Sequence, residues 1–155
     1  MSSRTVTVTV EDARWRNAPA LIPAIRRAVA LARERVAQAA SRKSQIAILL
    51  TGDGKLRALN RQFRGKDKPT NVLSFSAASQ DSLGDIAIAY GVTAREAMEQ
   101  DKSFAHHAIH LAVHGTLHLL GHDHQTTREA KAMEQREKEI LSELGIADPY
   151  AKAAA

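Results

Sequence analysis

The stretch His114-Gly-Thr-Leu-His118-Leu-Leu-Gly121-His122-Asp-His124 decides what fold and what site we expect of this chain. His114 and His118 are four residues apart, which on a helix places both imidazoles on one face, with Cβ atoms roughly 5–6 Å apart. Gly121 predicts the end of that helix, because glycine readily adopts the left-handed conformation common at helix C-termini. The chain would then turn and bring His124 to the same point. We therefore predict that three imidazoles hold one metal ion and leave a fourth position for water, as in catalytic zinc sites.

The distribution of histidine supports this interpretation. All seven histidines of the chain lie between His106 and His124. The alternative is a chance cluster, or a network of hydrogen-bonded core histidines without a metal. We favour the metal, because this helix is apolar nearly all round and its buried polar groups need partners. His110, one turn before His114, is expected either to support a ligand histidine or to belong to the core, and we prefer the core.

Composition limits the classes of protein. The chain has 155 residues, which suits one domain over residues 1–150 with a disordered tail at 151–155. It has no cysteine, so a metal must be held by His, Asp or Glu. We expect a cytoplasmic protein, because the N-terminus lacks the apolar run of a signal peptide and no segment is apolar for the length of a membrane span.

Charge suggests a polyanionic partner. The net charge is +5 and the calculated pI is about 9.8, which favours nucleic acid, although a basic surface can also be simply solvated. Aromatic residues make up only 4% of the chain. A broad base-stacking platform is therefore not expected, and phosphates should dominate any contact with RNA.

Periodicity predicts four strands and about five helices. The strands are expected at residues 4–10, 45–50, 71–76 and 84–89, with a polar loop at 77–82. Helices are expected to begin at 17–19, near 53, at the capping boxes 93–96 and 126–129, and at Ser103. In the second helix Leu56, Leu59 and Phe63 should point inward. This mixed order predicts a single-domain α+β fold, with a small mixed sheet packed around a central histidine-bearing helix.

Several blocks together resemble one known family. They are the three-histidine run, Leu59-Asn-Arg-Gln-Phe-Arg64 with Asp67-Lys-Pro-Thr-Asn-Val-Leu-Ser-Phe75, Leu83-Gly-Asp-Ile-Ala-Ile88, and Leu144-Gly145 with Asp148-Pro-Tyr150. In this order they resemble the YbeY family of bacterial rRNA-maturation endoribonucleases over about residues 46–150. One departure is His122, where the family usually has tyrosine.

The resemblance implies a metal-dependent, single-strand-specific endoribonuclease that acts in 16S rRNA 3′-end maturation and in ribosome quality control. Its metal ligands would be His114, His118 and His124, and its functional arginine Arg64. It further implies one divalent ion per chain, for which we prefer zinc, and RNA, the small ribosomal subunit and ribosome-assembly proteins as partners. His122 remains an alternative to His124 as ligand.

The mechanism expected at this stage is hydrolysis by a metal-activated water, whose pKa zinc would lower toward about 7. Arg64 would hold the scissile phosphate, since a guanidinium matches phosphate oxygens in a fork; alternatively it is an ordinary surface arginine. The general base stays open between Asp85, Asp123 and a histidine, although Asp123 fits better as an orienter of a ligand histidine.

Two other functions remain open at this stage. One is a zinc hydrolase acting on a different bond, which Gly115 disfavours, because zinc proteases of the His-Glu-x-x-His type have a glutamate at that position. The other is a non-enzymatic ribosome-associated factor with a structural metal, in which His122 could fill the fourth position.

Overall fold

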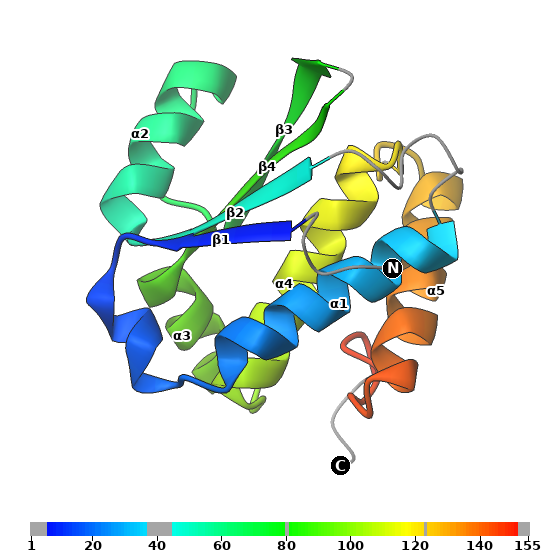
Figure 1. Cartoon of the computed structure of the whole chain (residues 1–155). Coiled ribbons are helices and arrows are strands. Elements are labelled where there is room, and N and C mark those ends of the chain that lie inside the picture. Colours follow the sequence, from blue (N-terminus) through cyan, green and yellow to red (C-terminus); the bar gives the residue numbers. More distant parts are fainter. Residues whose placement is uncertain (1–5, 37–44, 80, 123, 152–155) are drawn as a thin grey trace.

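The computed structural model describes residues 6–36, 45–79, 81–122 and 124–151. Four strands and five α-helices make up this part of the chain (Figure 1). The strands are β1 (Val6–Val10), β2 (Gln45–Thr51), β3 (Val72–Ser79) and β4 (Ser82–Ala89). The α-helices are α1 (Leu21–Val36), α2 (Asp53–Arg64), α3 (Tyr90–Glu99), α4 (Phe104–Leu119) and α5 (Thr127–Glu143), and a 3₁₀ helix, η2, spans Ala13–Asn17.

The strands form one mixed sheet in the order β1-β2-β4-β3. β1, β2 and β4 run parallel, and β3 pairs antiparallel with β4. Parallel neighbours need a crossover, which the helices between them supply. β3 therefore lies at one edge of the sheet, and among the described residues only β4 pairs with it.

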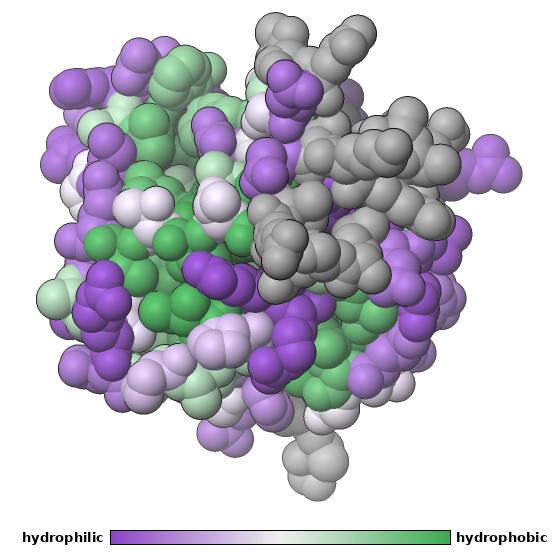
Figure 2. Space-filling model, viewed as in Figure 1, coloured by the Kyte–Doolittle hydropathy of each residue, from purple (hydrophilic) through white to green (hydrophobic). Residues whose placement is uncertain are grey.

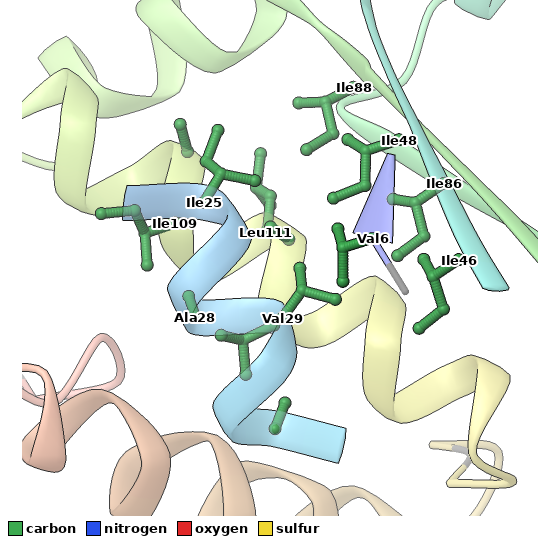
Figure 3. Packing of buried hydrophobic residues seen from close by; sticks show 14 of the residues in the cluster. Val6, Ile25, Ala28, Val29, Ile46, Ile48, Ile86, Ile88, Ile109 and Leu111 are labelled. Atoms are coloured by element: carbon green, nitrogen blue, oxygen red, sulfur yellow. The ribbon is translucent and has the colours of Figure 1, made fainter. Parts of the chain in front are cut away.

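The larger core lies on one face of the sheet. Figure 3 shows Val6, Ile48 and Ile86 of the strands turned toward Ile25 of α1 and Leu111 of α4. Leu117 of α4 and Met133, Ile140 and Leu141 of α5 extend the same cluster. A smaller core on the other face joins Leu56 of α2 to Leu73, Ala87 and Ala89. The sheet is therefore covered on both faces.

Figure 2 shows one side of the molecule, with hydrophilic residues around its rim and apolar residues visible left of its centre.

Helix α4 is central, as predicted. Eleven of its sixteen residues are buried, because it packs against α1, α3 and α5 as well as against β3 and β4. Ser103 caps it as expected, since the Ser103 hydroxyl accepts a hydrogen bond from the backbone N–H of His106 (3.0 Å). The predicted α+β class is confirmed: a small mixed sheet packs with five α-helices, one of which is the central histidine-bearing helix α4.

Some local expectations are wrong. Residues 77–82 are not a polar loop: β3 continues to Ser79 and pairs there with Ser82 of β4. The pattern at 93–96 does not start a helix, because α3 begins at Tyr90 and the Thr93 hydroxyl donates inside it to the carbonyl of Ala89 (2.6 Å). The carboxylate of Asp53 instead accepts from the backbone N–H of Val92 (2.9 Å), at the start of α3.

Two further expectations concern helix positions. The first long helix begins at Leu21 rather than at 17–19, because residues 13–17 form the 3₁₀ helix. Phe63 does not point inward but is 60% exposed. The expected strand residues 4 and 5, and the expected tail apart from Ala151, lie outside the described residues. Within the described ranges, no helix is long and apolar enough to cross a membrane.

Candidate metal centre

The last turns of α4 and the chain after it bring three histidines together. His114 and His118 lie one turn apart on α4, and the helix ends at Leu119. Gly121 follows with a φ of 99°, a left-handed conformation, and the N–H of His122 donates to the carbonyl of Leu117 (3.0 Å). This C-terminal turn sends the chain back, so that the His124 ring lies 4.8 Å from that of His118.

The donor geometry fits a tetrahedral ion. One ring nitrogen from each of His114, His118 and His124 lies within 4.8 Å of the others. The two Nε2 atoms of His114 and His118 are 3.2 Å apart. Tetrahedral zinc with Zn–N bonds of about 2.0–2.1 Å requires nitrogens about 3.3 Å apart. The first pair of nitrogens thus already has the separation that a shared ion requires.

A buried glutamate fixes the orientation of His114. Nδ1 of His114 donates to Oε1 of Glu137 on α5 (2.7 Å). A proton on Nδ1 leaves the Nε2 lone pair free, and Nε2 is the atom that faces His118. A carboxylate behind a histidine is the usual way in which proteins set the tautomer and raise the basicity of a metal-binding imidazole.

Glu137 is at the centre of a small polar network. Its side chain is fully buried. Oε2 contacts Nε2 of His110 (2.5 Å) and accepts from the hydroxyl of Tyr150 (2.6 Å). Burial alone would raise the pKa of the Glu137 carboxyl, but the hydrogen bonds with His110 and His114 outweigh it and lower that pKa to about 2. Burial and the bond to this carboxylate raise the pKa of the Tyr150 phenol.

Gly115 is a packing position. A Cβ atom at Gly115 would lie 2.9 Å from Cγ2 of Ile86 and 3.0 Å from Oγ of Ser74. The Ser74 hydroxyl also donates to the Gly115 carbonyl (3.0 Å), which ties α4 to β3. A glutamate at this position would collide with the sheet. The close contact between α4 and β3 therefore explains why the chain has no His-Glu-x-x-His motif.

The three histidines line an open cleft of about 850 Å³. Its other walls are the edge strand β3, through residues 72–76, and the end of α2 with Phe63 and Arg64. Among the described residues that line this cleft there is no carboxylate. Arg64 is exposed, and within the described part of the chain it has no ion-pair or hydrogen-bond partner, unlike Arg57, which pairs with Asp67. The guanidinium of Arg64 is therefore free to meet an anion in the cleft.

The other predicted site residues are placed as follows. Asp85 is exposed on β4 and does not line the cleft. His110 is buried and belongs to the Glu137 network. His122 is half-buried and is not among the described histidines whose ring nitrogens converge, whereas His124 is. Asp123 lies outside the described residues.

Sequence reasoning missed Glu137 and the role of Tyr150. A signal for Glu137 was present, because it occupies the apolar face of α5 at helical spacing from Met133, Ile140 and Leu141. An acidic residue on such a face needs a buried partner. Which partner it meets depends on how α5 packs against α4, and the periodicity of one helix does not show that.

A small α+β domain has the features of a metal-dependent hydrolase with an anionic substrate when three imidazoles converge in a cleft that an arginine borders and whose described lining has no carboxylate. The family model described as Endoribonuclease YbeY matches residues 10–145, and the chain belongs to that family.

Curated relatives agree with the family model. The chain is 47% identical over 152 residues to an Endoribonuclease YbeY of Rhodopseudomonas palustris, with 93% of this chain and 80% of the relative covered. It is 46% identical over 157 residues to one of Bradyrhizobium sp., covering 95% and 92%. A solution structure of TM1509 from Thermotoga maritima has the same fold, with a TM-score of 0.58 at 20% identity, over 95% of this chain and 99% of that one.

Proposed function

We propose that this protein is a metal-dependent endoribonuclease that cuts single-stranded RNA and acts on ribosomal RNA, at the 3′ end of 16S rRNA, in ribosome maturation and quality control. The observation that carries the proposal is the convergence of three imidazoles on one point of a cleft that Arg64 borders and that has no described carboxylate. Family membership supports the endoribonuclease class. Ribosomes and assembly proteins in the cytoplasm are the partners that this role requires.

His114, His118 and His124 are the ligands we propose for one divalent ion. The 3.2 Å separation of the first two Nε2 atoms and the cysteine-free sequence suit zinc, and imidazoles also suit nickel. When bound, such an ion acts as a Lewis acid toward water and phosphoryl oxygen. Three protein ligands would leave room for water or substrate on the ion, and the open cleft beside them supports a catalytic role over a structural one.

Arg64 binds the phosphate in this proposal. Its guanidinium can donate two parallel hydrogen bonds to phosphoryl oxygens and stabilise the charge that grows on them in the transition state. Glu137 accepts a hydrogen bond from Nδ1 of His114 and so orients the ring with Nε2 toward the other two histidines. Asp85 receives no role, because it does not line the cleft.

The two alternative functions find less support. A zinc protease needs a carboxylate base near the ion, and neither Gly115 nor any described residue that lines the cleft supplies one. A structural metal would be enclosed by protein, yet His124 is exposed and the cleft is open.

The test compares cleavage of one RNA sequence as a single strand and as a duplex, by wild-type protein and by Arg64→Ala. We expect the single strand to be cut, the duplex to be spared, and Arg64→Ala to be slower by about 10²- to 10³-fold, the usual effect of losing one transition-state donor. Arg61→Ala, an exposed arginine of the same helix outside the cleft, is the matched control. Equal rates for Arg64→Ala and wild type would contradict the proposed role of Arg64.

A further inference from the structure

The six aromatic residues of the chain divide into two groups. Trp15, Tyr90 and Phe104 pack against one another, with ring centroids 4.9–5.4 Å apart, on the main core. The other three lie beside the histidines. Phe63 and Phe75 line the cleft, and Tyr150 lines an adjoining cavity that shares His114 with it. Half of the aromatic side chains thus surround the candidate site in a protein with few of them.

Phe63 stands out because it is a large apolar residue that faces solvent at the rim of the cleft. It continues the stripe of Leu56 and Leu59 on α2, but Leu56 is fully buried and Phe63 is 60% exposed. The last turn of α2 therefore lies beyond the packed part of the sheet. The Phe63 ring packs against the half-buried Phe75 ring, with centroids 5.0 Å apart and planes at 55°. This contact holds the Phe63 ring in place while most of it faces solvent.

The charges next to Phe63 fit a nucleic acid. Arg64, the following residue, lines the same cleft. It also lines a neighbouring cavity of about 320 Å³, together with Lys66 and Lys68. Proteins bind single-stranded nucleic acids by combining a positively charged groove for the backbone with aromatic side chains on which bases stack. Both parts are present here within a few residues of each other.

We propose that Phe63, supported by Phe75, is a stacking site for an unpaired nucleobase next to the phosphate that Arg64 holds. The proposal rests on the proposed function and adds to it the feature of RNA that the cleft recognises. In a duplex both faces of a base are covered by its neighbours, so only an unstacked base can lie on Phe63. The stacking site therefore gives a physical reason for a preference for single strands, with little dependence on base identity.

The first test measures KM and kcat for a short single-stranded RNA with the metal-loaded protein. The variants are Phe63→Ala, Phe63→Leu and Phe63→Trp. Met98→Ala is the control, because Met98 is an 84% exposed apolar side chain that does not line the cleft. Loss of one base–aromatic stack should raise KM by about 5- to 150-fold. We expect this rise for Phe63→Ala and Phe63→Leu, and a KM close to the wild-type value for Phe63→Trp and Met98→Ala.

The second test observes stacking directly. Trp15 is buried, so a tryptophan placed at position 63 is the one that an added ligand can reach. We expect the fluorescence of Phe63→Trp to be quenched by single-stranded RNA, and to remain nearly unchanged with an abasic oligonucleotide of the same length and charge. Equal quenching by both oligonucleotides would overturn the stacking site, because the phosphates alone would then explain the contact.

The outcomes separate this proposal from the proposed function. If the wild type cuts RNA and Phe63→Ala or Phe63→Leu has an unchanged KM, the stacking site is wrong and the nuclease remains. If the wild type does not cut RNA, the proposed function fails, and the fluorescence titration still decides whether position 63 contacts a base. Thermal melting of each variant excludes loss of fold as the cause.

Discussion

Replacing Glu137 tests whether its buried carboxylate orients His114 for metal binding. In Glu137→Gln the side chain keeps its shape but loses its charge. The bond it makes to Nδ1 of His114 is 2.7 Å long and charge-assisted. Such a bond contributes about 1.5–3 kcal/mol, which corresponds to roughly 10- to 150-fold in binding. Losing a carboxylate behind a ligand histidine usually costs about 10- to 100-fold in metal affinity. We therefore expect zinc to bind Glu137→Gln about 10- to 100-fold more weakly.

The assay is a zinc titration against a chromophoric chelator, with a thermal melt of the apo and zinc-loaded forms beside it. Glu139→Gln is the matched control, because Glu139 is on the same helix two residues away and is exposed. It should bind zinc like the wild type.

Glu137→Ala should lower the stability of the fold more than Glu137→Gln. It leaves His110, His114 and the hydroxyl of Tyr150 without their buried partner. Removing one member of such a network costs about 3–5 kcal/mol, or roughly 6–20 °C in Tm for a protein of this size. If folded Glu137→Gln binds zinc as tightly as the wild type, the carboxylate does not contribute to the metal centre.

Further predictions concern the ligands, the packing and the metal. His124→Ala should lose zinc binding while His122→Ala keeps it, since His124 and not His122 belongs to the cluster of converging ring nitrogens. The same chelator titration tests this, and zinc binding lost only in His122→Ala would make His122 the third ligand. Gly115→Ala should destabilise the fold by about 1–3 kcal/mol in a urea titration, because its Cβ would overpack α4 against Ile86 and Ser74; unchanged stability would mean that α4 can shift. Removal of zinc should leave the far-ultraviolet circular dichroism intact, because apolar side chains such as Leu111 and Leu117 hold α4 in the main core. It should lower Tm by roughly 5–10 °C if zinc is present at about 100-fold its Kd, whereas unfolding on chelation would indicate a structural metal.

The parts that were predictable from the sequence are those fixed by local chemistry. His114, His118 and Gly121 follow one another at spacings typical of a helix and its left-handed C-terminal residue, so the convergence of imidazoles could be expected. The helix caps Ser103 and Thr126 were also identified correctly, because each side-chain hydroxyl accepts a hydrogen bond from the backbone N–H three residues later in the sequence.

The parts that failed depend on contacts between distant segments. Asp53 lies at the expected start of α2, yet its carboxylate accepts from the backbone N–H of Val92, which is 39 residues away in the sequence. Phe63 follows Leu56 at helical spacing on α2, but only Leu56 is buried, because the packed part of the sheet ends before Phe63. Glu137 on α5 meets His114 on α4 only through helix packing. A one-dimensional pattern shows which face a residue is on, and not what that face meets.

The most direct test of the central claim is the metal content and RNA cleavage of the wild type beside His114→Ala, purified in the same way. We expect that the wild type carries about one divalent ion and cuts a single-stranded RNA, and that folded His114→Ala has lost both. Equal cleavage by the two proteins would show that the activity does not depend on the three-histidine centre.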